Sequence, residues 1–250
     1  MLNKYKNEDI KRMKNLKLMT DEHSRNIKIN PTKYRSLIGN LLYLSISIRP
    51  DILYSVSRAA RNSQDPNLED WNNALKILGY LKETINYGLK FTQSQTINAY
   101  SDSDYTGDSK TRRSTSGYII TMGTTPICWS SKLQHCVSTS TAEAEYYSLS
   151  ECAKQCMWYK SMLNELNYNI KTINVNVDNK ATIFIGNNNM VNQKTKHIDI
   201  RYHYIRELIE NKELNLKYMK SHDNLADGFT KYLNNSLMTN FRNKILCKFE

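Results

Sequence analysis

The spacing of apolar residues changes near residue 87 of this 250-residue chain, and that change most constrains the fold. From Pro31 to about residue 86, apolar side chains recur at three- and four-residue steps, which places them on one face of a helix. After that point come short runs rich in β-branched and aromatic residues, separated by Gly, Asp, Ser or Pro, which indicates strands. The chain is therefore expected to join a small helical unit to a larger α/β part.

The helical unit, residues 31–92, is expected to contain three helices. The first covers YRSLIGNLLYLSISI and ends at Arg49-Pro50, because proline disrupts a helix interior but suits the first turn of the next helix. The second and third cover DILYSVSRAARN and LEDWNNALKILGYLKETI. Residues 1–30 are lysine-rich and weakly periodic, and they are interpreted as a basic lead-in whose composition is compatible with disorder.

The α/β part is expected over residues 95–232, before a C-terminal tail at 233–250. Strands are predicted at YGLKFT, INAYSDSDY, SGYIITMG, TPICWSSK, INVNVD and LNLKYMK. A long helix is predicted at TAEAEYYSLSECAKQCMWYKSMLNEL, with further helices at 179–187, at 199–212 and from about Leu225. Together these elements predict an α/β fold, a mixed sheet covered by helices.

Charge and cysteine content narrow the functional classes. The 35 Lys and Arg against 24 Asp and Glu give a net charge of +11, which favours a polyanionic partner such as nucleic acid. A genome-wide bias toward Lys and Asn would give the same excess without such a partner.

The five cysteines contain no CxxC pair, so free thiols in a reducing compartment are expected rather than a zinc site. No signal peptide or membrane span is predicted, which indicates an intracellular, cytoplasmic protein.

Four carboxylates stand at or next to the ends of predicted buried elements. Asp102 lies in the stretch YSDSDYTGDS, and the others are Glu145, Asp178 and Asp227. Each alone has an ordinary explanation as a turn former, a solvated helix residue or a helix cap. Burying several unpaired carboxylates together is costly unless cations lie among them, and Mg²⁺ prefers oxygen ligands. Their joint placement therefore favours a magnesium site over four separate caps, with Asp104 and Asp108 shaping the turn.

Four long motifs resemble the ribonuclease H region of copia-type retrotransposon Pol polyproteins. They are YSDSDYTGDSKTRRSTSGYIITMG, ICWSSKLQHCVSTSTAEAEYYSLSECAKQCMW, TKHIDIRYHYIRELI and NLADGFTK. The upstream segment, from YRSLIGNLLYLSISIRPDI to INYGLKF, resembles the connection between reverse transcriptase and ribonuclease H in the same family. The resemblance extends from about Tyr34 to Lys231.

This resemblance implies a ribonuclease H-like fold with a five-stranded sheet, preceded by a helical connection. It implies hydrolysis of the RNA strand of an RNA–DNA hybrid with two Mg²⁺ ions, for which Mn²⁺ is an alternative. The matching metal-binding carboxylates are Asp102, Glu145, Asp178 and Asp227, with Asp102 as the expected bridging ligand. His222 is compared with a mobile histidine that precedes the last carboxylate in cellular ribonucleases H. The implied partner is the rest of a reverse transcriptase, in the cytoplasm or within retroelement particles.

Two polar clusters are candidates for nucleic-acid contact. Lys110, Arg112 and Arg113 follow the aspartate turn, where phosphate contact and a solvated loop are about equally expected. Ser138, Thr139 and Ser140 precede the long helix, and helix capping explains at least one of them equally well. For His197 and His203, a spacing of six residues does not align the side chains on one helical face, so structural roles are preferred to zinc binding.

Two other functions remain compatible with the sequence. One is a catalytically inactive nucleic-acid-binding remnant of a retroelement polyprotein, and the other is an interaction module that binds a partner through the long helix. The intact set of four carboxylates favours the enzyme. The paired aspartates of a reverse transcriptase are not visible, so the chain is not expected to polymerise DNA. It is expected to be either the end of a longer polyprotein or a truncated copy.

Overall fold

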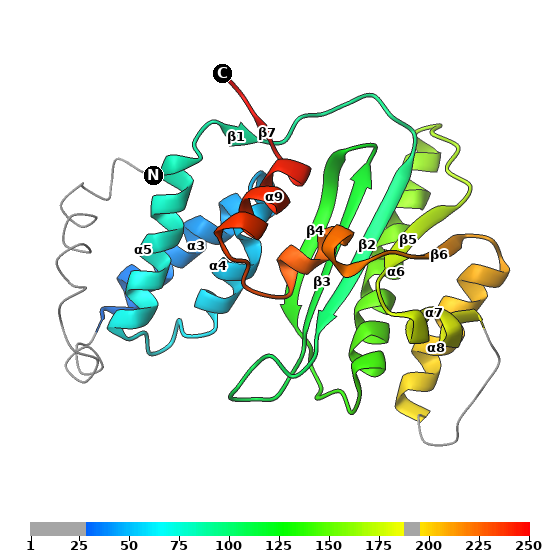
Figure 1. Cartoon of the computed structure of the whole chain (residues 1–250), viewed down its shortest axis with the longest axis horizontal. Helices are drawn as coiled ribbons and strands as arrows, with labels where there is room; N and C mark the ends of the chain where they lie inside the picture. The colour runs from blue at the N-terminus through cyan, green and yellow to red at the C-terminus, as the bar shows by residue number, and fades with distance from the viewer. Residues whose placement is uncertain (1–28, 188–195) are drawn as a thin grey trace. The chain divides into compact units, whose positions relative to one another are not determined.

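A computed structural model describes residues 29–187 and 196–250 (Figure 1). The predicted lead-in lies outside these residues except for Ile29 and Asn30, and the side chain of His197 is not among those described. The structure divides into two compact units. One is the chain through Gly88 together with Leu246–Glu250, and the other is Leu89–Ile245.

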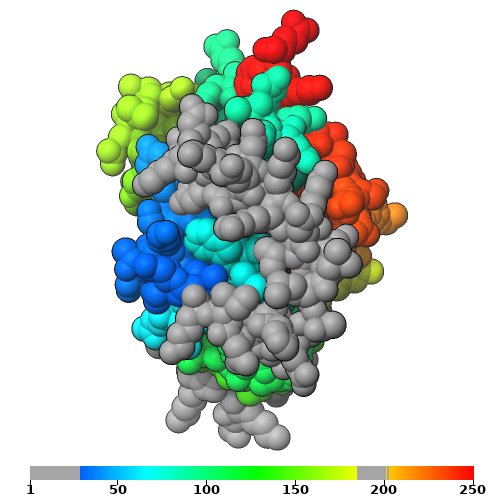
Figure 2. Space-filling view, turned by 90° about the vertical axis from the view of Figure 1, so that its left-hand side faces the viewer, coloured from blue at the N-terminus to red at the C-terminus, as the bar shows by residue number. Residues whose placement is uncertain are grey.

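The first unit packs three α-helices around one apolar core. They are α3 (Pro31–Ser47), α4 (Leu53–Ala60) and α5 (Leu68–Glu83), with a 3₁₀ turn η2 (Pro50–Ile52) before α4. Asn30 and Asn67 cap α3 and α5 by accepting hydrogen bonds from their first backbone N–H groups. Part of α3 is visible in blue in Figure 2, and the side chains of its Tyr43 and Ile46 are exposed. The core consists of Tyr34, Leu37, Ile38, Leu41, Ile52, Val56, Ala74, Leu75, Leu78 and Leu81.

A short strand pair completes this unit and corrects one prediction. The strand predicted over YGLKFT is present only as β1 (Tyr87–Gly88), which pairs antiparallel with β7 (Cys247–Lys248). Residues 89–96 form no regular secondary structure. They are anchored by a hydrogen bond that the Thr125 hydroxyl donates to the Lys90 carbonyl at 2.8 Å.

Arg49, directly before Pro50, forms a buried ion pair that joins the helices of the first unit. Its guanidinium makes two parallel hydrogen bonds to Asp51, at 2.9 and 2.8 Å, and both side chains are almost fully buried. The same guanidinium donates to the carbonyl and the hydroxyl of Thr84, at 3.1 and 2.7 Å. Tyr80 donates its hydroxyl to Asp51 at 2.7 Å, so the pair is satisfied on both sides.

Replacing Arg49 by methionine is expected to lower the free energy of unfolding by about 3–5 kcal/mol, because Asp51 would remain buried without its cation. Urea denaturation measures the change. The matched control is Lys154→Met, which removes an exposed ion pair with Glu151 and should cost about 0.2–1 kcal/mol. Equal losses for the two variants would contradict a structural role for the buried pair.

The second unit is built on a mixed five-stranded sheet, which confirms the predicted α/β fold class. The strands are β2 (Ile97–Asp104), β3 (Thr115–Met122), β4 (Thr125–Leu133), β5 (Ile173–Val177) and β6 (Leu214–Tyr218). Their order is β4-β3-β2-β5-β6. The pairs β4–β3 and β3–β2 are antiparallel, while β2–β5 and β5–β6 are parallel.

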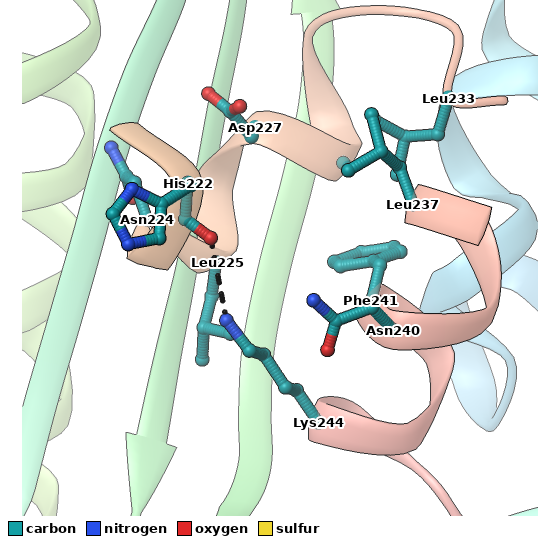
Figure 3. A pocket seen from close by; sticks show the side chains of 10 residues that line it. His222, Asn224, Leu225, Asp227, Leu233, Leu237, Asn240, Phe241 and Lys244 are labelled. Carbon is teal, nitrogen blue, oxygen red and sulfur yellow. Dashed lines mark hydrogen bonds between the residues drawn. The ribbon is translucent and has the colours of Figure 1, made fainter. Parts of the chain in front are cut away.

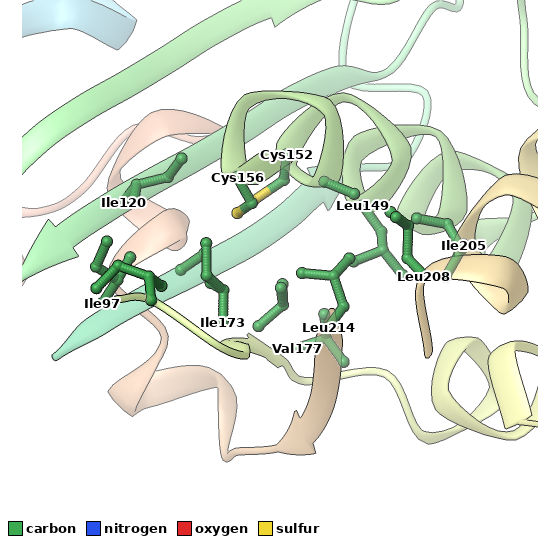
Figure 4. Close-up of a cluster of buried hydrophobic side chains, with 14 of the residues drawn as sticks. Ile97, Ile120, Leu149, Cys152, Cys156, Ile173, Val177, Ile205, Leu208 and Leu214 are labelled. Carbon is green, nitrogen blue, oxygen red and sulfur yellow. The ribbon is translucent and has the colours of Figure 1, made fainter. Parts of the chain in front are cut away.

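One face of this sheet packs against α6 (Thr141–Glu165), with α7 (Lys180–Asn187) and α8 (Lys196–Glu210) nearby (Figure 1). The core between sheet and helices includes Ile97, Ile120, Leu149, Cys152, Cys156, Ile173, Val177, Ile205, Leu208 and Leu214 (Figure 4). Cys152 and Cys156 are fully buried, and all five cysteines are free thiols in this structure. None of the helices in the described parts of the chain is long and apolar enough to span a bilayer.

The C-terminal part of the second unit differs from the prediction. Instead of one helix from about Leu225, the chain forms two 3₁₀ turns, η3 (Ser221–Asp223) and η4 (Leu225–Phe229), and then the helix α9 (Asn235–Ile245). The segment expected to be a tail thus contains α9. Gly228 allows η4 to pack closely against α9, because a Cβ there would lie 2.4 Å from the ring of Phe241 on α9. η4 contacts β2 and β3, so the element that carries Asp227 lies directly on the sheet.

Candidate metal centre

Three of the four predicted carboxylates meet near the C-terminal ends of the neighbouring strands β2 and β5. Asp102, Glu145 and Asp178 each offer a carboxylate oxygen, and these oxygens all lie within 4.8 Å of one another. Tyr100 and Asn176 are paired in register on the parallel strands β2 and β5, so the residues two positions further, Asp102 and Asp178, emerge side by side. Among the described residues this is the one such group of three or more potential ligands, and it contains no histidine.

Ser148 fixes the helix that supplies Glu145. Its side chain is fully buried one turn after Glu145 on α6, and its hydroxyl is 2.7 Å from the Asp102 carbonyl and 3.2 Å from the Gly117 carbonyl. It also accepts a hydrogen bond from the Ser101 hydroxyl at 3.1 Å. α6 is therefore tied to β2 and β3 at the level of Asp102, which sets the position of Glu145 relative to the strand.

The electrostatics of this carboxylate cluster favour a bound cation. The pKa of Asp102 is raised to about 7, mainly by burial and also by the charges of Asp227 and Asp178, while a hydrogen bond from Thr230 lowers it. Burial also raises the pKa of Glu145 to about 10, with Asp102 and Asp178 adding to the shift. The donors are all carboxylate oxygens, the ligands that hard divalent ions prefer. The residues present therefore fit Mg²⁺ or Mn²⁺.

Asp227, the fourth predicted carboxylate, lies beside the cluster but not within it. Its Oδ2 forms an ion pair with Lys231 Nζ at 2.7 Å. Within the described part of the chain its Oδ1 is buried and has no hydrogen-bond partner. Its charge still raises the pKa values of Asp102 and Glu145. The structure thus brings Asp227 within electrostatic range of the cluster and pairs it with a lysine.

Residues that the sequence did not single out position Asp227 and Asp102. The buried Thr230 donates its hydroxyl to a carboxylate oxygen of Asp102 and lies 3.2 Å from the Asp227 carbonyl. Asn224, also buried, donates to the Ser101 carbonyl at 3.0 Å and accepts from the Ala226 N–H at 3.0 Å. Asn224 and Thr230 both lie in the NLADGFTK motif, which is the one feature of the sequence that could have drawn attention to them. Their hydrogen-bond partners on β2 are more than a hundred residues away in the sequence, so these contacts could not be predicted from local patterns.

Gly117 makes room for this arrangement. It pairs with Asp102 across β2 and β3, and a Cβ there would lie 2.7 Å from Thr230 Cγ2 and 2.8 Å from Phe229 Cβ. These distances are too short for any real contact, so a side chain at residue 117 would displace η4.

Gly117→Ala is therefore expected to lower the free energy of unfolding by about 1–3 kcal/mol through overpacking. It should also weaken divalent-ion binding, because η4 carries Asp227. Thermal unfolding with and without Mg²⁺ measures both effects. Gly79→Ala is the control, since no atom lies within 4 Å of its added Cβ and alanine in a helix is favoured by up to about 1 kcal/mol. A fully stable Gly117→Ala protein with unchanged metal binding would contradict the steric argument.

His222 lies on η3, shortly before Asp227. Together with Asp227, Asn240, Phe241 and Lys244 it lines a small cavity of about 60 Å³ between η4 and α9 (Figure 3). Its imidazole is exposed and lies 3.1 Å from the Asp223 carboxylate, while its carbonyl accepts from Lys244 Nζ at 3.4 Å. The predicted functional histidine thus lines the same cavity as Asp227, with its side chain exposed.

The basic residues after the aspartate turn are available to a ligand. Lys110 and Arg112 are exposed and Arg113 is half-buried. Asp108 shapes this turn, since its carboxylate accepts from the backbone N–H and the hydroxyl of Thr111 at 2.8 and 2.9 Å. Contact with phosphates stays a prediction for these three basic residues.

The Ser-Thr-Ser run before α6 has intramolecular partners. Ser138 is 2% exposed and donates to Gln134 Oε1 at 2.8 Å, so we leave Ser138 out of the proposed nucleic-acid interface. Ser140 is the N-cap of α6 and accepts from the Glu143 N–H at 3.1 Å. Thr139 donates its N–H and hydroxyl to the Glu143 carboxylate, both at 2.6 Å. Thr139 and Ser140 are exposed, and His203 is exposed on α8.

Comparison with curated proteins identifies relatives among transposon polyproteins. The retrovirus-related Pol polyprotein from transposon TNT 1-94 of Nicotiana tabacum is 39% identical over 199 residues, 79% of this chain and 15% of that protein. The retrovirus-related Pol polyprotein from transposon RE2 of Arabidopsis thaliana is 36% identical over 226 residues, 89% of this chain and 16% of that protein. The chain thus spans about one sixth of the length of these relatives. No family model matches the chain.

Comparison with solved structures finds ribonuclease H1 from the halophilic archaeon Halobacterium salinarum NRC-1. It is 12% identical with a TM-score of 0.41, and the match covers 58% of this chain and 98% of that one. Over most of its length the chain is a homologue of the retrovirus-related Pol polyproteins of copia-type transposons.

Proposed function

We propose that the unit Leu89–Ile245 is a ribonuclease H that hydrolyses the RNA strand of RNA–DNA hybrids as part of a retrotransposon Pol polyprotein. The observation that carries this proposal is the convergence of Asp102, Glu145 and Asp178 within 4.8 Å, on a ribonuclease H-like sheet. The remainder of a reverse transcriptase would be its partner, in the cytoplasm or in retroelement particles.

Asp102, Glu145, Asp178 and Asp227 would hold two Mg²⁺ or Mn²⁺ ions, with Asp102 as the central ligand. When bound, such ions supply an activated water and stabilise the charge that develops on the leaving 3′ oxygen. The protein's own contribution is to keep these carboxylates in place before substrate arrives. Thr230 orients the Asp102 carboxylate, Ser148 holds the helix that carries Glu145, and Gly117 lets η4 approach the sheet.

Hybrid binding would use charge and shape rather than base sequence. The net charge of +11 favours a polyanion, and the exposed Lys110 and Arg112 lie on the loop that follows β2. Thr139 and Ser140 lie at the start of α6, about one turn before Glu145, where their exposed side chains could contact the RNA backbone. The A-form-like geometry and the 2′-hydroxyl groups of the hybrid would provide selectivity.

His222 is proposed to assist turnover near Asp227, because both line the cavity under α9. His222→Ala should slow multiple-turnover cleavage several-fold while leaving the fold intact, since its side chain is exposed. Unchanged turnover would remove His222 from the site.

The alternative is an inactive nucleic-acid-binding remnant with the same fold. A panel of end-labelled substrates separates the two functions: RNA–DNA hybrid, RNA duplex and DNA duplex of one sequence, each with Mg²⁺ and with EDTA. A ribonuclease H cuts only the RNA strand of the hybrid, and only with Mg²⁺. Hybrid binding without cleavage by a metal-loaded protein would support the remnant.

A further inference from the structure

Lys231 places a positive charge at the edge of the carboxylate cluster. Its Nζ lies 2.7 Å from Asp227 Oδ2, one helical turn away in sequence. Its side chain is half-exposed, while that of Asp227 is only one-fifth exposed. The ammonium is thus held from the solvent side against a carboxylate that is largely enclosed by the protein.

The charge of Lys231 also reaches the cluster itself. The side chain interacts electrostatically with Asp102 and Asp178 as well as with Asp227. In the absence of metal, these carboxylates would otherwise repel one another with little to offset their charge. Lys231 therefore supplies part of the positive charge that the cluster needs when no ion is bound.

We propose that Lys231 is a built-in competitor of the second divalent cation, occupying Asp227 until that ion displaces it. This inference rests on the proposed function, since it concerns the same metal site. The Lys231 ammonium lies on Asp227 Oδ2, and a divalent ion bound to the same carboxylate would be repelled by that ammonium. The buried Oδ1 of Asp227, which has no hydrogen-bond partner among the described residues, is the remaining oxygen for an incoming ion. An ion at Oδ1 would be repelled by the Lys231 ammonium at Oδ2, so Asp227 would bind that ion less tightly while the ion pair is intact, and entry of the ion would weaken the pair.

Removing the charge of Lys231 should tighten metal binding. For Lys231→Met, calorimetric titration of the metal-free chain with Mn²⁺ at pH 8, without nucleic acid, is expected to give a Kd for the weaker site about tenfold lower than for the unmodified chain. Lys231→Arg keeps the charge and should bind within about twofold of the unmodified chain. Circular dichroism checks that each variant is folded.

The matched control is Lys154→Met, because Lys154 is a similarly exposed lysine paired with a carboxylate one turn away, Glu151, outside the cluster. Its Mn²⁺ affinity should not change. A Kd for Lys231→Met that is unchanged or higher would overturn the competitor role; a higher Kd would instead make Lys231 a residue that positions Asp227. If the unmodified chain binds no Mn²⁺, the proposed function itself fails. If the unmodified chain binds Mn²⁺ but Lys231→Met does not bind it more tightly, only the competitor role of Lys231 fails.

Discussion

Replacing Asp102 by asparagine is expected to reduce cleavage of an RNA–DNA hybrid at least about a thousandfold, which corresponds to about 4 kcal/mol of transition-state stabilisation. The Asp102 carboxylate interacts electrostatically with Asp178 and Asp227, and it accepts the Thr230 hydrogen bond. Asparagine keeps its size but removes the charge and one metal-binding oxygen. Hybrid binding should persist, because the residues proposed to contact phosphates, Lys110 and Arg112, are unchanged.

Asp104→Asn is the matched control on the same strand. The Asp104 carboxylate lies against Gly107 in the following turn, where an added Cβ would overlap it. It is also outside the group of three converging ligands. Cleavage by Asp104→Asn should stay within a few-fold of the unmodified chain. Equal loss in both variants would mean that Asp102 acts through the turn rather than as a ligand.

The metal-free protein is expected to lose stability as pH rises from about 4 to about 8. Folding raises the pKa of Asp102 from 3.8 to about 7 and that of Glu145 from 4.5 to about 10. Between the unfolded and folded pKa values the native state binds more protons than the unfolded state, so the free energy of unfolding falls with rising pH. Each raised pKa unit corresponds to about 1.4 kcal/mol, so a loss of several kcal/mol is expected over this pH range.

Divalent ions should reverse this loss. Saturating Mg²⁺ should raise Tm at pH 8 by several degrees and at pH 5 by much less, because the carboxylates are largely protonated at low pH. KCl at equal ionic strength controls for general screening. Asp102→Asn should be more stable than the unmodified chain at pH 8 without metal and should respond weakly to Mg²⁺. A metal-free protein whose stability rises between pH 5 and 8 would contradict the repulsive cluster.

Local patterns in the sequence predict most elements of the second unit. The strands β2 to β6 and the helix α6 lie within a few residues of the predicted runs, because their apolar periodicities are clear and turn residues separate them. The α/β class is confirmed. YGLKFT was misleading because strand-forming residues do not specify a partner. Only Tyr87–Gly88 pair, and they pair with β7 near the end of the chain.

The site depends on contacts that local patterns cannot reveal. Asp102 and Asp178 are neighbours because β2 and β5 pair in parallel with one particular register. Asp227 is on a 3₁₀ turn that can approach the sheet because residue 117 is glycine, and that can pack against α9 because residue 228 is glycine. The sequence suggested that the Ser138 hydroxyl could contact nucleic acid. Its burial against Gln134 depends on the tertiary fold and could not be predicted from local patterns. Metal binding by the four carboxylates stays a prediction.

Metal binding by the carboxylate cluster is tested most directly by an anomalous diffraction map of crystals soaked in Mn²⁺. We expect anomalous density within about 2.0–2.3 Å of carboxylate oxygens of Asp102, Glu145 and Asp178, the distance range of such bonds. The same soak of Asp102→Asn crystals should show that density lost or strongly reduced. Carboxylates that remain free of Mn²⁺ in crystals of the unmodified chain at pH 8, with Mn²⁺ density elsewhere or nowhere, would contradict a metal centre at this cluster.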